Sequence, residues 1–184
     1  MACDISWGRV LPCTDAVGGL DAIYFINEDT LGVVTLGSAD TEDVITSIVN
    51  AGGTTNLYKY DLKGTSTFNQ VMNSSRENGT TFVEQTLVLN LPVMSSIYHK
   101  QFKLLAWGNP KVIVRTTSGS FFMMGLEFGC DVTTINANSG AAMGDMTGYE
   151  VTLVAREKTF ANYINATTES GMVTLVDGNL ITTD

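Results

Sequence analysis

The sequence predicts a mainly β (α+β) fold: an antiparallel β-sandwich or barrel with one packed α-helix, at about residues 95–107, and a long protruding β-hairpin. Glycine is abundant (18 residues), proline is scarce (3), and Thr, Val and Ser recur between short apolar runs, a composition that favours strands and turns. Only one stretch combines a helical period with clear start and stop signals. Because 44% of the 184 residues are apolar and no linker or internal repeat divides the chain, we expect a single domain, 1–184, with a sizeable core.

The first fifty residues are expected to hold an arm, a hairpin and one segment of undecided type. Residues 1–19 mix small, polar and apolar side chains without a period and end in Gly-Gly, which indicates an N-terminal arm. Residues 22–26 and 31–36 are apolar runs on either side of a four-residue polar turn, so we expect them to pair as a hairpin. Residues 42–50 fit either a short helix or a strand, because their inward-facing side chains are β-branched.

A long antiparallel hairpin is expected from residues 57–72 and 81–91. Apolar and polar side chains alternate in both segments, with Gln85 on the apolar face of the second, and the wholly polar stretch 73–80 between them is expected to form an exposed tip. The outer face would carry Lys59, Asp61, Lys63, Glu84, Thr86 and Asn90. Such a hairpin exceeds what one domain needs for its core, which indicates assembly with other copies.

The helix at about 95–107 has a defined start and stop. Ser95 or Ser96 can cap its first turn, and Gly108 and Pro110 end it. We expect it to lie on a sheet, with the other side open to solvent or a partner. The expected inward stripe is Ile97, Gln101, Leu104 and Leu105, with Tyr98 and Phe102 beside it, and the expected basic face is His99, Lys100 and Lys103.

After the helix, the pattern predicts a second hairpin, a loop and a late strand. Residues 112–128 contain two apolar runs around a polar turn, and residues 131–148 are rich in Gly, Asn and Ala and are expected to form a long loop. Residues 149–157 alternate and are expected to be a strand in the sheet that the helix covers. Residues 165–184 are expected to form a C-terminal edge hairpin or arm.

Charge and composition bound the partners. A net charge of −9 and a pI near 4.4 argue against sequence-independent binding to DNA or an anionic membrane, although an acidic wall can face nucleic acid without sticking to it. No apolar run reaches the roughly 20 residues of a membrane span, and the first residues lack signal-peptide features, so we expect synthesis for the cytoplasm and no membrane partner. Cys3, Cys13 and Cys130 have no metal-site spacing and are expected to be reduced, mostly buried thiols.

No catalytic constellation is visible in the sequence. The one histidine, His99, lies beside two lysines with no carboxylate or serine at a helical spacing. The glycine-rich segment 140–145 lacks the Lys and Ser/Thr that would follow in a phosphate-binding loop, and 145–150 lacks the spacing of a calcium loop. We therefore expect no enzyme activity, no cofactor and no metal.

The charges are unevenly distributed along the chain, and this suggests how copies recognise each other. Residues 1–58 hold eight acidic residues, with Asp40, Glu42 and Asp43 clustered, against a single Arg. Residues 99–115 hold four basic residues, including Lys100 and Lys103, and no acidic one. The charges are either ordinary solvated surface or the two halves of a head-to-tail contact.

The order of elements resembles the tail-tube fold of tailed bacteriophages, which ring-forming tail and neck proteins share. It comprises an arm, a long polar-faced hairpin, a strand that ends at Leu91, the helix at 95–107, the hairpin at 112–128 and the late strand at 149–157, and so covers most of the chain. The segment MGDMTGYEVTLVAREKTFANYI also resembles phage structural proteins.

The resemblance implies a virion structural protein without enzyme activity. In that family subunits form hexameric rings, long hairpins build a continuous barrel, and stacked rings pass DNA through an often acidic channel without specific binding. By position, strands 57–72 and 81–91 would line the barrel, and loop 73–80, with Arg76 and Glu77, would contact the next ring. The implied partners are further copies of the chain and other virion tail or neck proteins, and the implied location is the virion, after assembly in the host cytoplasm.

Two other function classes fit the same composition. One is a capsid-decorating or fibre-anchoring virion protein, which would be monomeric or trimeric. The other is a small ligand-binding β-sandwich, whose aromatic residues would converge in one pocket. Ring formation distinguishes the three.

Overall fold

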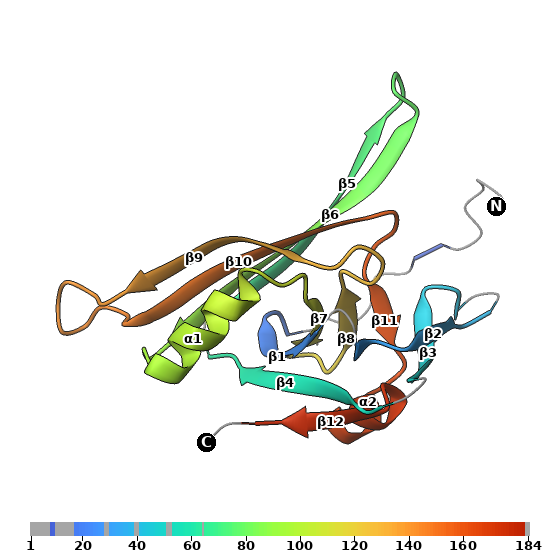
Figure 1. Ribbon diagram of the computed structural model, residues 1–184. Helices are drawn as coiled ribbons and strands as arrows, with labels where there is room; N and C mark the ends of the chain where they lie inside the picture. Colours follow the sequence, from blue (N-terminus) through green and yellow to red (C-terminus); the bar gives the residue numbers. More distant parts are fainter. Residues whose placement is uncertain are drawn as a thin grey trace.

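The computed structural model describes residues 8–9, 17–27, 30–38, 41–50, 53–63 and 65–182, and it contains two packed β-sheets and two helices (Figure 1). This confirms the mainly β (α+β) prediction as a β-sandwich, and the described strands form two open sheets rather than a closed barrel. Nearly all of the arm expected at 1–19, with Cys3 and Cys13, lies outside the described residues.

Sheet A has eight strands in the order β12-β4-β1-β7-β8-β11-β3-β2. Most neighbours are antiparallel, but β11 pairs parallel with β3 and β12 parallel with β4, so this sheet is mixed and not purely antiparallel as expected. Its strands are β1 (Leu20–Ile26), β2 (Val33–Leu36), β3 (Val44–Val49), β4 (Thr55–Asp61), β7 (Lys111–Thr116), β8 (Phe121–Met124), β11 (Asn162–Ile164) and β12 (Gly178–Ile181).

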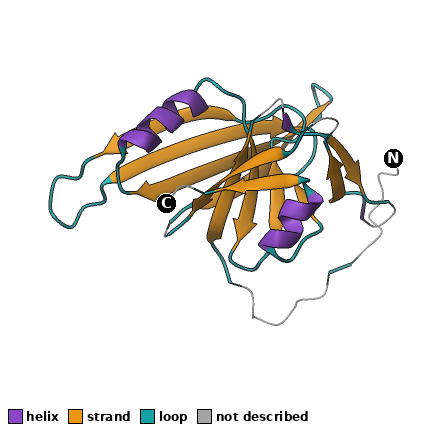
Figure 2. Ribbon diagram, turned by 60° about the horizontal axis from the view of Figure 1, so that its bottom comes forward, coloured by secondary structure: helices purple, strands orange, loops and turns teal. Residues whose placement is uncertain are grey.

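Sheet B has four antiparallel strands in the order β5-β6-β10-β9: β5 (Thr67–Ser75), β6 (Thr80–Pro92), β10 (Gly148–Glu157) and β9 (Asp131–Asn138). The alternation expected in β6 is confirmed, because every second side chain from Val83 to Leu91 is buried, Gln85 included. β10 confirms the late strand. The two helices are α1 (Ser96–Leu105) and α2 (Glu169–Leu175) (Figure 2).

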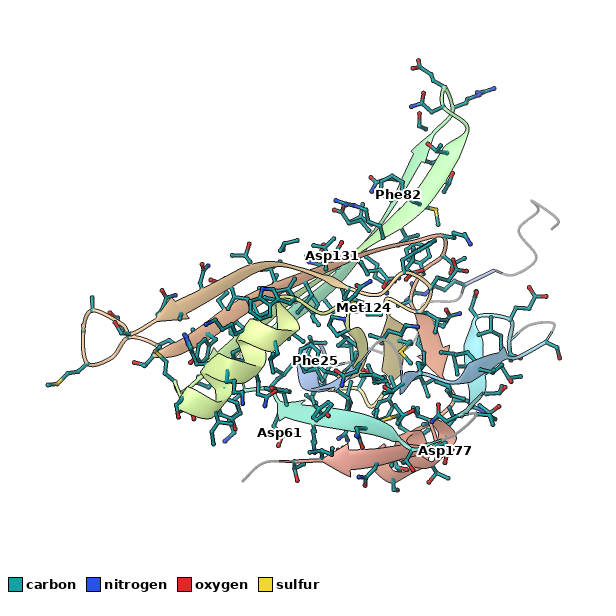
Figure 3. The ribbon with its side chains drawn as sticks, viewed as in Figure 1. Phe25, Asp61, Phe82, Met124, Asp131 and Asp177 are labelled. Atoms are coloured by element: carbon teal, nitrogen blue, oxygen red, sulfur yellow. The ribbon has the colours of Figure 1, made fainter. Side chains whose placement is uncertain are left out.

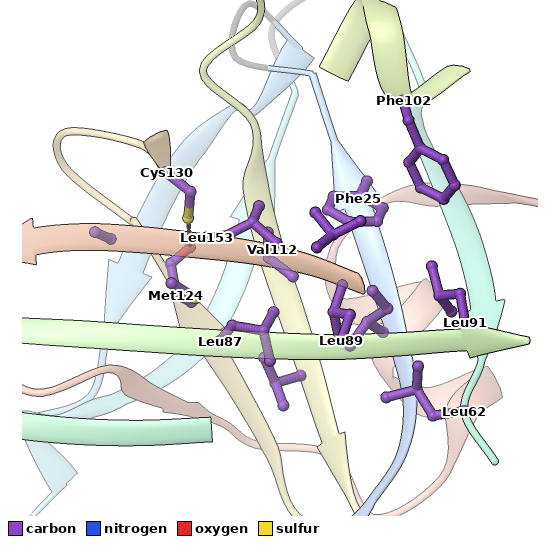
Figure 4. Close-up of a cluster of buried hydrophobic side chains, with 14 of the residues drawn as sticks. Phe25, Leu62, Leu87, Leu89, Leu91, Phe102, Val112, Met124, Cys130 and Leu153 are labelled. Carbon is purple, nitrogen blue, oxygen red and sulfur yellow. Dashed lines mark hydrogen bonds between the residues drawn. The ribbon is translucent and has the colours of Figure 1, made fainter. Parts of the chain in front are cut away.

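The core has two clusters, one on each face of sheet A. The first lies between the sheets, where Phe25 and Val112 of sheet A meet Leu87, Leu89 and Leu153 of sheet B (Figure 4). The second lies on the opposite face, where side chains of β1, β7, β8, β3 and β11 pack against α2. Ala22–Ile26 of β1 and residues 112–114 of β7 are therefore buried on both faces, which explains why they are continuous apolar runs.

Two buried polar side chains join sheet B to the corner that follows β8. Gln85 Oε1 accepts a hydrogen bond from the Gly125 backbone N–H at 3.2 Å, and its Nε2 donates to the Thr159 carbonyl at 3.4 Å. Glu157 Oε1 accepts from the backbone N–H groups of Glu127 and Phe128 at 3.1 and 3.0 Å. Buried polar groups need hydrogen-bond partners. Gln85 and Glu157 can therefore lie on otherwise apolar strand faces, because these hydrogen bonds satisfy them.

Helix α1 is where the sequence places it, but a different stripe is buried. Ser95 accepts a hydrogen bond from the Ile97 N–H, as expected for the cap. The helix ends at Leu105 with Ala106 as its C-cap, so it stops before Gly108 and Pro110, and Gly108 is not a left-handed cap. Phe102 is 3% exposed and contacts Tyr149 of β10 with ring centroids 4.8 Å apart. Ile97 and Leu104, expected inward, are 59% and 51% exposed. The helix covers one end of the sandwich, so only a narrow stripe through Tyr98, Phe102 and Leu105 reaches the core.

The prediction that residues 22–26 and 31–36 pair as a hairpin is wrong. Both segments are strands, but β1 pairs with β4 and β7 in the middle of sheet A, whereas β2 pairs with β3 at its edge. The undecided segment 42–50 contains the strand β3, in keeping with its β-branched side chains.

The long hairpin exists, but its first strand is shorter than expected. Residues 57–61 belong to β4 in sheet A, and the chain crosses to sheet B before β5 begins at Thr67. The hairpin is therefore β5–β6, and strand pairing from Ser75↔Thr80 leaves residues 76–79 as the turn, in place of the tip expected at 73–80. Gly79 has a φ of 63°, which suits its place in this turn.

One later expectation is confirmed and two change. The hairpin at 112–128 is confirmed as β7–β8, although its second strand ends at Met124. Residues 131–138 of the loop expected at 131–148 are instead the strand β9. The C-terminal region contains α2 and the edge strand β12, which pairs with β4, so it forms an edge but not a hairpin.

Replacing Phe102 with Ala should lower the free energy of unfolding by about 3–5 kcal/mol, since a large side chain leaves a packed interior. Leu104→Ala, on the same helix but half-exposed, is the matched control and should cost less than about 1 kcal/mol. Chemical denaturation of the two variants measures the difference. Equal losses would contradict the burial of Phe102 and the exposure of Leu104.

Candidate functional site

The face of sheet B that points away from the core, which we call the outer face, is predominantly neutral and polar. The strand registers place alternate residues of all four strands on it, opposite the buried set. Its neutral polar side chains include Thr67, Asn69, Asn73, Thr86, Asn90, Thr134, Asn136 and Thr152. Its charged side chains are Glu84, Asp131, Glu150 and Arg156, and its apolar side chains are Val71, Phe82, Val88 and Val154.

The outer face has an excess of acid. Arg156 Nε lies 3.3 Å from Glu84 Oε2, so the one basic residue pairs with one of the three acidic residues. Glu150 accepts a weak hydrogen bond from Asn136 at 3.4 Å. Lys59 and Lys63, which were expected to share this face with Glu84, do not lie on it, because β4 belongs to sheet A. The face is thus more acidic than the mixed surface that the sequence suggested.

Sheet B ends in two edge strands, β5 and β9, each paired with one neighbour in the described part of the chain. An edge strand presents a row of backbone N–H and C=O groups that can pair with another chain. Six of the eight residues of β9 are polar or small, and β5 leads into the hairpin tip. The sheet can therefore be extended on both sides.

The far part of the β5–β6 hairpin extends beyond the rest of sheet B (Figure 1). The pairing of β6 with β10 ends at Val83↔Glu157, so residues 73–82 pair only with each other. All but Ser75 are exposed, including Phe82, which Figure 3 shows on the projecting hairpin. A two-stranded hairpin on its own is marginally stable in water, so this segment is suited to packing on another molecule.

The remaining predicted interface residues are not brought together into one site. Arg76 and Glu77 are exposed at the hairpin turn, and Lys63 is exposed after β4. Lys100 and Lys103 are exposed on α1, and Glu42 and Asp43 are exposed just before β3. Asp40 lies outside the described residues.

Lys59 and Asp61 belong to an ion-pair network on β4. Lys59 Nζ lies 2.8 Å from Glu169 Oε1 and 3.3 Å from Asp61 Oδ1, and the buried Tyr24 hydroxyl donates to Glu169 at 2.9 Å. Partial burial alone would raise the pKa of Glu169, but the hydrogen bonds from Lys59 and Tyr24 hold that pKa below its ordinary value. The hydrogen bond to Glu169 in turn raises the pKa of Lys59. The network fastens α2 to sheet A and is structural.

A groove of about 650 Å³ lies between α1 and β4. Tyr60 is one of its lining residues, and its ring centroid lies 5.3 Å from that of Phe25, 6.1 Å from that of Phe102 and 6.2 Å from that of Tyr98. Burial raises the pKa of Tyr60. The aromatic side chains thus converge in one place, which is the feature expected of a ligand-binding β-sandwich.

Sequence reasoning missed the residues that β9 and β10 contribute to the outer face. The registers of β9 and β10 shift between Thr152 and Leu153, so Val132 and Ile135, three positions apart, both point inward. That irregularity removes the strict alternation by which a strand is recognised in a sequence. Asp131 was therefore not identified, although β9 has an apolar residue at each of these two inward positions.

Neither a metal site nor a membrane-spanning helix is found in the described residues. Within the described ranges, no group of three His, Cys, Asp or Glu side chains is arranged to hold a metal ion, and no helix there is long and apolar enough to span a membrane. His99 is exposed, 6.3 Å from the Tyr149 ring. No family model, no curated protein and no solved structure matches this chain.

Replacing Glu169 with Gln should lower stability by about 1–2 kcal/mol at pH 7, because hydrogen bonds to a charged group are lost. Since the folded-state pKa of Glu169 is lowered, its contribution is present above the unfolded pKa of about 4.3 and disappears as the pH falls through the folded value. The wild-type advantage should therefore be constant from about pH 6 to 8 and shrink below about pH 4.

Unfolding curves at several pH values test this expectation. Glu77→Gln, at the exposed hairpin turn, is the matched control and should show little change at any pH. A difference between wild type and Glu169→Gln that grows toward acid pH would contradict the assigned sign.

Proposed function

We propose that this chain is a virion structural protein that assembles with copies of itself into rings. The rings would form a tail tube or neck channel of a tailed bacteriophage, with the genome passing through the lumen. Its partners are then further copies and neighbouring tail or neck proteins, and its location is the virion, after assembly in the host cytoplasm. The proposal includes no enzyme activity.

The observation that carries this proposal is the arrangement of sheet B. Its inner face is buried against sheet A, while its outer face is polar and its two edge strands, β5 and β9, have unpaired outer sides in the described part of the chain. If β5 of one copy pairs with β9 of the next, the B sheets of several copies form one continuous barrel. The outer faces would then line the lumen, and sheet A and α1 would lie outside it.

The composition of the outer face suits a channel for DNA. Neutral Thr and Asn side chains dominate it, and Glu84, Asp131 and Glu150 outnumber Arg156. A wall with an acidic excess repels phosphates, and the shortage of basic groups removes the charge that would hold DNA in place. Passage without specific binding follows from this balance.

The protruding hairpin supplies the second support. Residues 73–82 have no packing partner within the described chain, and exposed apolar side chains lie on both faces of this hairpin, Val71 and Phe82 on the outer face and Met72 on the other. Burial of these side chains against a neighbouring copy would stabilise both the hairpin and the ring.

The aromatic groove favours a second candidate function, a ligand-binding β-sandwich. The groove between α1 and β4 contains three partly exposed tyrosines, Tyr58, Tyr60 and Tyr98. That function requires no assembly, so a chain that remains a single copy and is stabilised by a small molecule would favour it over the ring. Measuring the oligomeric state therefore separates the two candidates.

The test is a variant in which a two-residue Asn-Gly turn replaces residues 73–82. Met72 and Val83 are directly opposite each other, so such a turn can close the pair. The free energy of unfolding of the single copy should change by less than about 1 kcal/mol, because the removed residues make no core contacts. Sedimentation velocity should show ring-sized particles for the wild type and much smaller ones for the variant.

Arg76→Ala combined with Glu77→Ala is the matched control, since it keeps the hairpin length and alters only the turn. It should keep the ring-sized particles, because the apolar side chains that the proposed ring contact buries lie on the strands of the hairpin and not at its turn. A shortened chain that sediments like the wild type would exclude the hairpin from the ring contact, and a wild type that remains a single copy at every concentration would contradict the assembly.

A further inference from the structure

Two exposed apolar surfaces with opposite charge lie at different ends of the molecule. The α1 surface consists of Ile97, Leu104 and Trp107 together with Lys100 and Lys103. The β2–β3 surface consists of Val33 and Val49 together with Glu42 and Asp43. Soluble proteins seldom leave clusters of large apolar side chains exposed unless a partner covers them.

The α1 surface is the side of the helix that the core does not use. Trp107 is 80% exposed, and Ile97 and Leu104 are more than half exposed. The helix carries no acidic residue in its first turn, and in the described part of the chain neither Lys100 nor Lys103 forms an ion pair. This surface is therefore both apolar and basic.

The neighbouring Val93 has a backbone φ of 75°, which is unfavourable for a β-branched residue, and it is 68% exposed. Its N–H donates to the Thr147 carbonyl at 2.7 Å, which holds the strained turn in place beside the helix. The exposed side chain of Val93 thus adds to the apolar side chains beside α1.

The β2–β3 surface has the complementary character. Val33 and Val49 are cross-strand partners, 70% and 60% exposed, on the side of the strands away from the core. β2 is also the last strand of sheet A. Glu42 and Asp43 are exposed at the start of β3, and none of the ion pairs within the described residues includes them.

A line from the α1 surface to the β2–β3 surface runs roughly along the strands of sheet B. β10 begins against α1, where Tyr149 contacts Phe102, and leads to β11, which pairs with β3. Figures 1 and 2 both show α1 and the β2–β3 pair at opposite ends of the molecule. In the proposed barrel this direction has a large component along the tube, since barrel strands tilt about 35–45° from the axis.

We propose that the α1 surface of one copy docks on the β2–β3 surface of a copy in the adjacent ring. This contact rests on the proposed ring function and adds the surface by which rings stack. It is heterologous, so it repeats along the tube without closing. The apolar side chains supply the buried area, and the opposite charges set the register and raise the association rate.

The test uses two charge-reversed chains and their mixture. Lys100→Glu with Lys103→Glu makes both ends acidic, and Glu42→Lys with Asp43→Lys makes both ends basic. Each variant alone should form rings but stack at least about tenfold more slowly than wild type in 10 mM salt, with a smaller defect in 150 mM salt, where charges are screened beyond about 8 Å. A one-to-one mixture should recover stacking, because each ring then meets a complementary end.

Light scattering gives the stacking rate, and electron microscopy distinguishes rings from stacks. The control exchanges the charges of a surface pair elsewhere, Lys158→Glu with Glu127→Lys, whose charged atoms lie 2.7 Å apart, and it should stack like the wild type. Normal stacking of either variant alone, or a mixture that does not recover, overturns the inference while rings persist. A wild type that forms rings but never stacks also overturns it, and a wild type without rings overturns both proposals.

Discussion

The pairing of β1 with β7 is the constraint on which the rest of the structure depends, because both strands are buried on both faces. One set of their side chains, with Phe25 and Val112, faces sheet B. The other set, with Tyr24 and Ile113, belongs to the second core cluster, which includes residues of α2. Each face requires a cover, since an exposed apolar strand face is unfavourable in water. Sheet B and α1 contribute to the cover on the first face, and α2 contributes to the cover on the second.

That arrangement determines which surfaces remain for function. Sheet B contributes only its inner face to the core, so its outer face, its edges and the far end of the β5–β6 hairpin are left uncovered by the described chain. Gln85 and Glu157 hold the sheet to the corner after β8 through buried hydrogen bonds, so its position is well defined. A rigid sheet with two open edges and a polar outer face is suited to join copies edge to edge around a lumen, as we propose.

Sequence reasoning recovered the elements that local signals define and missed those that depend on tertiary context. Ser95 and Pro110 bracket α1, and the period of β6 and β10 identifies their buried faces. Helix phase was wrong because Ile97 and Leu104 are as apolar as Phe102, and only packing decides which of them faces the core. The partners of β1 could not be read from its neighbours in the chain, since a strand between two cores has no alternation. Lys59 was assigned to the outer face for a related reason: no local signal marks the crossing between β4 and β5.

The central claim is that copies of sheet B join by their edges around a polar lumen. Electron microscopy of the purified wild-type protein tests it most directly, because it shows the assembly without any substitution. The account predicts rings with a central hole in end views. Compact trimers without a hole, or particles no larger than one chain, would contradict it.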